Sequence, residues 1–115
     1  MKISFSIYNI CNNEEAQEAL KNCDLIILPA GDWGSSLDKL REIGGVEPIR
    51  LRHCYDSGVI YDYLCGTREA PCMEKAAIEV ETIKQSLPKG EELTIYTMDS
   101  FYDGTVREYK LTLPE

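Results

Sequence analysis

The segment with the clearest capacity for chemistry is a glycine-rich stretch at residues 31–36, Gly31-Asp32-Trp33-Gly34-Ser35-Ser36. It follows an apolar run at residues 25–28, which is typical of a buried strand in a parallel sheet. Open α/β sheets bind ligands at the carboxyl ends of their strands, and a helix that begins nearby offers free N–H groups to an anion. The stretch therefore predicts either a ligand-binding loop or a turn that caps the next helix.

Three features favour the turn. The Asp32 carboxylate would repel a bound phosphate, and the stretch matches neither the P-loop nor the dinucleotide-binding fingerprint. Trp33 stands where a nucleophile elbow built on Ser35 requires its first glycine. A structural turn is therefore the favoured interpretation, and a ligand loop is the alternative.

His53 is the only histidine, so any imidazole-based proton transfer must use it. We expect His53 and Asp56 at the end of a third strand, on the same sheet edge as the loop, and both are candidate ligand-binding residues. A Ser35–His53–Asp56 triad or a Cys65–His53 dyad is sterically conceivable, but nothing in the spacing indicates one. We therefore predict no catalytic set.

The five cysteines, at positions 11, 23, 54, 65 and 72, favour a reducing compartment. Their number is odd and no pair has the C-x-x-C spacing, so a disulfide framework is not indicated. A structural zinc site would need short, paired ligand spacings, which are absent around His53. We expect free thiols, no metal or cofactor, and a cytoplasmic protein.

The charge balance narrows the classes of partner. The 115 residues carry a formal charge of −8, from 20 acidic and 12 basic side chains. This argues against a nucleic-acid binder, which needs a basic footprint. The longest apolar run, at residues 25–30, is too short to span a bilayer, so no membrane partner is expected. An acidic surface could instead dock on a basic macromolecule, although ordinary solubility also explains such a charge.

The C-terminal third predicts an antiparallel hairpin with an aromatic tip. Asp103 and Gly104 form a two-residue turn signal, which would place Tyr96 opposite Leu111, Met98 opposite Tyr109 and Thr94 opposite Leu113. Aromatic side chains at a hairpin tip are hard to bury and make rigid interface anchors. The candidate partner-binding residues are therefore Phe101, Tyr102 and Asp103, with packing over the sheet edge as the alternative.

Hydrophobic periodicity predicts a single α/β or α+β domain over residues 1–115, with a mixed sheet of about five strands and helices packed on it. The expected strands are residues 2–9, 24–30, 47–53, 93–102 and 105–113. A helix capped by Asn12 or Asn13 should precede the second strand, and Ser35 or Ser36 should cap a short helix at 37–43 that ends at Gly44-Gly45. Residues 57–65 favour a helix over a strand, and an apolar stripe predicts a further helix from residue 73 to 87.

These patterns favour a non-enzymatic binding or inhibitory protein that docks on a macromolecular partner. Bacterial immunity proteins, antitoxins and phage-encoded anti-defence inhibitors share this small size and acidic charge, which is an analogy only. The alternative is a small-molecule or nucleotide-binding module, or a small hydrolase, that uses the 31–36 loop and His53. A homo-oligomer that pairs through a strand edge is a third expectation.

Overall fold

A mixed five-stranded sheet forms the centre of the fold, as predicted. The computed structural model describes residues 1–8, 10–55, 57–66, 74–98 and 106–115. The strands lie in the order β3-β2-β1-β4-β5. The β1–β2, β2–β3 and β1–β4 pairs are parallel, and β4–β5 is antiparallel. The strands are β1 (Lys2–Ser4), β2 (Leu25–Leu28), β3 (Ile49–Arg50), β4 (Glu92–Met98) and β5 (Val106–Thr112).

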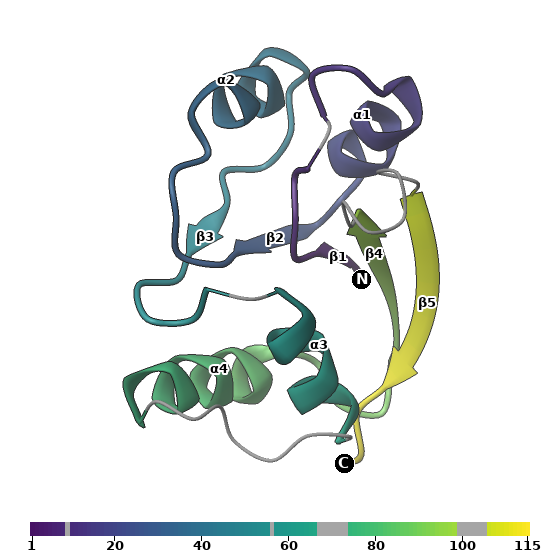
Figure 1. The fold of residues 1–115 in the computed structure, drawn as a ribbon. Coiled ribbons are helices and arrows are strands. Elements are labelled where there is room, and N and C mark those ends of the chain that lie inside the picture. Colours follow the sequence, from purple (N-terminus) through teal and green to yellow (C-terminus); the bar gives the residue numbers. More distant parts are fainter. Residues whose placement is uncertain (9, 56, 67–73, 99–105) are drawn as a thin grey trace.

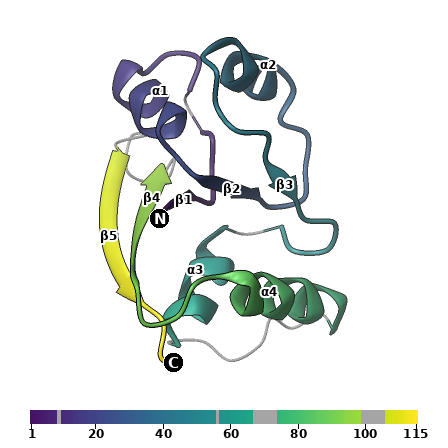
Figure 2. The ribbon, with the colours of Figure 1, turned by 180° about the vertical axis from the view of Figure 1, so that it is seen from behind.

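Helices cover both faces of the sheet. They are α1 (Glu14–Lys21), α2 (Gly34–Glu42), α3 (Ser57–Cys65) and α4 (Glu74–Ser86). Helices α1 and α2 lie on one face, and α3 and α4 on the other (Figures 1 and 2). The chain passes from β1 through β2 to β3 at one edge of the sheet, and then crosses back to pair β4 with the other side of β1. Because crossovers between parallel strands are right-handed, this change of direction places α3 and α4 on the face opposite to α1 and α2.

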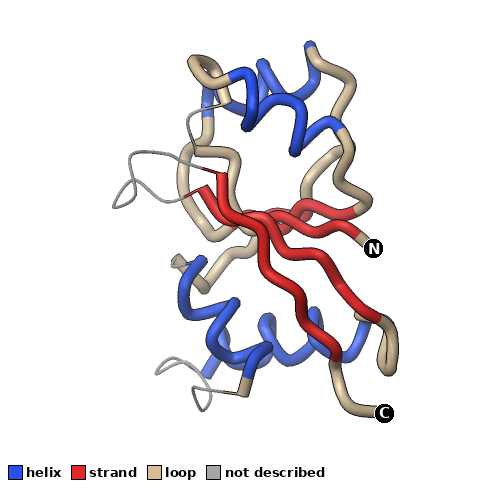
Figure 3. The backbone as a smooth tube through the Cα atoms, turned by 90° about the vertical axis from the view of Figure 1, so that its right-hand side faces the viewer, coloured by secondary structure: helices blue, strands red, loops and turns tan. Residues whose placement is uncertain are grey.

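Two hydrophobic cores result, one on each side of the sheet, and Figure 3 shows the strands between the two helical layers. Side chains of β2 alternate between them: Ile26 and Leu28 pack with α1 and α2, whereas Ile27 packs with α3 and α4. The uninterrupted apolar run of this strand therefore reflects burial on both faces.

The first strand is shorter than predicted because serine side chains capture the backbone after Ser4. The Ser4 hydroxyl donates to the Ser6 carbonyl (2.7 Å) and accepts from the Ser6 N–H (3.3 Å). The Ser6 hydroxyl in turn accepts from the Tyr8 N–H (3.0 Å). Such local bonds compete with a strand ladder. Residues beyond Ser4 therefore leave the sheet, although Phe5 and Ile7 remain buried.

The third strand is also shorter than the predicted 47–53. The Leu51 N–H still donates to the Leu28 carbonyl of β2 (2.9 Å). The next two N–H groups, of Arg52 and His53, donate instead to the carboxylate of Glu79 in α4. A side chain from another layer thus replaces the neighbouring strand and ends the ladder.

The predicted hairpin pairing is wrong by three residues. Leu111 lies opposite Leu93 rather than Tyr96, and Tyr109 lies opposite Ile95 rather than Met98. Leu93 and Ile95 are fully buried, and the observed register places them on one face with their apolar partners. Burial of these two side chains therefore outweighs the preference of the Asp103-Gly104 turn signal, which itself lies outside the described residues.

The helix ends follow local signals with one exception. The Asn13 side chain caps α1 by accepting from the Ala16 N–H (3.1 Å), and residues 57–65 are helical as predicted. Helix α2 begins at Gly34, three residues earlier than predicted, so Ser35 and Ser36 lie inside its first turn and do not cap it. It ends at Glu42 with Ile43 as the C-cap, and Gly44 follows with a φ of +82° that suits glycine.

Candidate functional site

The structure places the 31–36 loop beside the residues that follow β3, as the parallel sheet requires. The Ala30 N–H donates to the Cys54 carbonyl (2.7 Å), and the Arg50 guanidinium donates to the Gly31 carbonyl. The loop and His53 therefore share the carboxyl edge of β2 and β3, where open sheets bind ligands.

Side chains of this loop have structural partners. The Asp32 carboxylate accepts from the Gly34 N–H (3.0 Å), an Asx turn at the start of α2. The Trp33 indole donates to the Pro29 carbonyl (3.1 Å) and packs against the α1–α2 core. These contacts agree with a capping turn, and ligand binding by residues 31–36 stays a prediction.

Glu79 is the residue at this edge that sequence reasoning missed. Both of its carboxylate oxygens accept from the Arg52 N–H (3.0 and 3.1 Å), and one accepts from the His53 N–H (2.8 Å). That same oxygen lies 3.8 Å from Nε2 of His53. No local signal marks Glu79, because it is 26 residues from His53 and lies on the expected polar face of α4.

This pair defines what the edge can do chemically. Glu79 is 19% exposed and His53 38%, so the carboxylate is held by backbone donors while the imidazole still meets solvent. The exposed ring of His53 is therefore a group at this edge that could contact a bound ligand. The remaining predicted residues of this site and of the hairpin tip, Asp56, Phe101, Tyr102 and Asp103, lie outside the described residues.

Metal binding and membrane insertion find no support in the part of the chain that the structure describes. No three potential ligands among His, Cys, Asp and Glu gather there closely enough to hold a metal ion. None of the helices described is both long and apolar enough to cross a bilayer. Cys23 and Cys54 are buried and Cys11 is exposed, and none of these three forms a disulfide.

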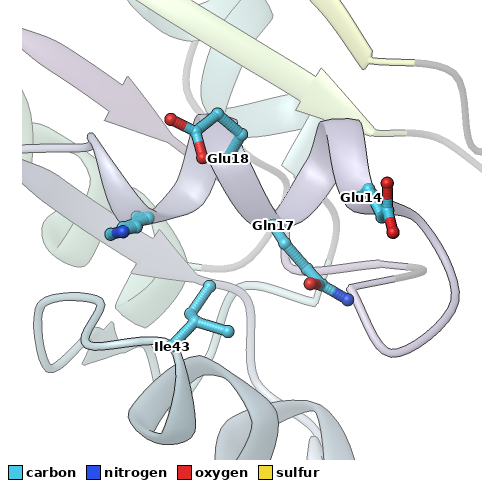
Figure 4. Close-up of a pocket in the computed structure, with 5 residues that line it drawn as sticks. Glu14, Gln17, Glu18 and Ile43 are labelled. Carbon is cyan, nitrogen blue, oxygen red and sulfur yellow. The ribbon is translucent and has the colours of Figure 1, made fainter.

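Two surface hollows lie along α1, away from the 31–36 loop. The first has a volume of about 430 Å³ and is lined by Glu14, Gln17, Glu18, Lys21 and Ile43. In Figure 4 the Gln17 side chain extends on the side of α1 where Ile43 lies, and Glu18 points the other way. The Gln17 amide donates to the Ile10 carbonyl (2.8 Å), so it is already engaged within the fold.

The second hollow, which we call the α1–hairpin hollow, lies between α1 and the β4–β5 hairpin. Its volume is about 280 Å³. Its apolar lining comprises Ala19, Tyr96 and Val106, which pack against the α1–α2 core. Its polar and charged lining comprises Lys2, Glu15, Glu18, Asn22 and Glu108. Three carboxylates against one ammonium make this hollow acidic.

Two of the three carboxylates have defined partners. The Asn22 amide donates to the Glu18 carboxylate (3.2 Å), and Lys110 lies 2.8 Å from the Glu108 carboxylate. Its hydrogen bond to Glu108 raises the pKa of Lys110. The described structure thus orients Glu18 and Glu108 around an apolar centre that sequence reasoning did not identify, because α1 and the hairpin are distant in the sequence.

Comparison of the chain with protein-family models, with curated proteins and with solved structures found no match in any of the three.

Proposed function

We propose that this protein is a non-enzymatic binding protein that docks on a basic protein through the acidic face of α1. The observation that carries the proposal is the α1–hairpin hollow, in which carboxylates surround an apolar centre. An arginine or lysine side chain of the partner complements this arrangement. Its aliphatic stem would lie on Tyr96 and Val106, while its cation would meet the carboxylates of Glu15, Glu18 and Glu108.

The charge around the hollow supports the same class of partner. Glu14, Glu15 and Glu18 are all exposed on α1, and the whole chain carries a net charge of −8. Such a surface attracts a basic partner over a distance and orients the encounter. Because exposed charges act mainly on the rate of association, we expect binding to weaken strongly as salt is added.

The test is a paired charge neutralisation. In Glu15→Gln/Glu18→Gln two carboxylates of the hollow lose their charge, while Glu42→Gln/Glu74→Gln neutralises two exposed carboxylates on α2 and α4. Both variants change the net charge equally. We would immobilise each protein and capture partners from a nuclease-treated lysate of the native host.

The expected result is one stoichiometric protein that binds wild type and the α2/α4 control, and that is released by salt and by Glu15→Gln/Glu18→Gln. An arginine-rich peptide titrated into isotope-labelled protein should shift the amide signals of Ala19 and Tyr96 in wild type but not in this variant. Equal binding by both variants, or peptide shifts confined to other surfaces, would refute the proposal.

A further inference from the structure

Strand β5 is a long, exposed sheet edge. It is the last strand in the sheet order, and it runs along the outer margin of the molecule with no described helix or strand beyond it (Figure 1). Five of its seven residues are exposed: Arg107, Glu108, Tyr109, Lys110 and Thr112. Exposed edges of this length are templates for pairing with another chain.

The hydrogen bonds of β4 determine which backbone groups of β5 face outward. The Thr94 N–H donates to the Met1 carbonyl (2.9 Å) beside β1, so Thr94 turns its backbone groups away from β5. Lys110 lies opposite Thr94 and must likewise face away from β4. By strand alternation, the backbone N–H and C=O groups of Glu108 and Lys110 both point to the free edge.

This geometry restricts how a second copy of β5 could pair in the antiparallel sense. Three registers near the centre of the strand join outward-facing residues: Glu108 opposite Glu108, Lys110 opposite Lys110, or Glu108 opposite Lys110. The first two place like charges directly opposite each other, which is destabilising. Only the third pairs opposite charges, and by symmetry it does so twice.

We propose that the chain forms a symmetric dimer in which two β5 strands pair antiparallel about Tyr109, joining the two sheets into one. Each Glu108–Lys110 pair across the axis would exchange two backbone hydrogen bonds. Within one chain Lys110 already lies 2.8 Å from the Glu108 carboxylate. The four side chains would therefore alternate in charge around the axis, with each carboxylate between two ammonium groups.

The opposite face of the strand supplies an apolar contact. Tyr109 is 38% exposed and its ring lies 5.5 Å from that of Tyr61, centroid to centroid. On the dimer axis Tyr109 would face Tyr109 of the second copy in a position without backbone bonds, where side chains approach most closely. Because one strand of each copy makes this contact, we expect it to bury less than the about 1,200 Å² of a standard interface and the dimer to dissociate on dilution.

The test is a charge swap read by light scattering over a range of protein concentrations. Wild type should approach twice the monomer mass at high concentration. Glu108→Lys and Lys110→Glu should each remain monomeric, because each creates like charges opposite one another. The double variant Glu108→Lys/Lys110→Glu, and an equimolar mixture of the two single variants, should both regain the doubled mass, because each restores opposite charges across the axis.

A matched control is Glu74→Lys, which changes the net charge as much as Glu108→Lys but lies on α4. It should dimerise like wild type, and circular dichroism of every variant would establish that the fold is retained. A monomeric wild type at all concentrations, or a mixture of the single variants that stays monomeric, would overturn the proposal. The test of the α1–hairpin hollow substitutes Glu15 and Glu18, whereas the dimer test substitutes Glu108 and Lys110. Each proposal can therefore fail without the other.

Discussion

Replacing Glu79 should destabilise the protein by removing the carboxylate that ends β3. The Arg52 and His53 N–H groups would lose this acceptor, since the ladder to β2 stops at Leu51. A hydrogen bond to a charged group contributes about 1.5–3 kcal/mol net. Because Arg52 is exposed and water can replace part of the loss, we expect about 2–3 kcal/mol for Glu79→Ala.

The conservative variant sharpens this prediction. In Glu79→Gln an amide oxygen in the place of Oε1 can still accept from both N–H groups. The amide nitrogen is a donor, so it cannot replace the second oxygen that accepts from Arg52, and the negative charge is lost. We expect Glu79→Gln to lose roughly half as much stability as Glu79→Ala. At about 4 °C per kcal/mol for a domain near this size, Glu79→Ala should lower Tm by roughly 10 °C.

The assay is urea and thermal unfolding together with amide hydrogen exchange at Arg52 and His53. Glu42→Ala is the control, because that carboxylate is 70% exposed and pairs with Lys39 at 3.4 Å on the surface. It should change stability by at most about 0.5 kcal/mol. If Glu79→Ala were as stable as this control, with both amides still protected from exchange, the structural role assigned to Glu79 would be refuted.

Two further predictions concern titration. Burial, the largest cause, raises the pKa of the Cys23 thiol from 9.0 to about 12. Just above pH 9.0 this thiol ionises in the unfolded chain but not in the folded one, which favours the unfolded state. The free energy of unfolding is therefore unaffected by this thiol below pH 9.0, and it falls by about 1.4 kcal/mol per pH unit as the pH rises toward 12. Cys23→Ala should therefore lose stability less steeply in alkali than wild type during urea unfolding, and equal slopes would contradict this. The Tyr63 hydroxyl donates to the Glu81 carboxylate, which lowers the pKa of Glu81. Tyr63→Phe should raise that pKa toward 4.5 in an NMR titration, and an unchanged value would show that the bond does not persist in solution.

Features that depend on neighbouring residues could be predicted well. The Asn13 cap, the helix at residues 57–65 and the glycine that ends α2 each involve groups within a few positions of one another. The apolar run of β2 likewise indicated burial on both sides, because its composition leaves no polar face. Local propensity and periodicity suffice for such elements.

The hairpin register shows where local signals fail. The turn signal predicted Tyr96 opposite Leu111, whereas the structure pairs Leu93 with Leu111. Leu93 and Ile95 face a core that includes residues of α3 and α4, so the favourable register depends on packing against distant helices. A turn motif cannot report on that packing.

The sequence by itself determined the class of fold, the number of strands, most helix ends and the acidic charge, because periodicity, caps and composition are properties of short segments. Only the tertiary structure decided which groups meet: Glu79 with the backbone of His53, and α1 with the hairpin around the acidic hollow. It also decided that β5 lies at a free edge with Glu108 and Lys110 facing outward. These contacts join residues far apart in the chain, and they follow from sheet order and from burial on both faces, which no local pattern encodes.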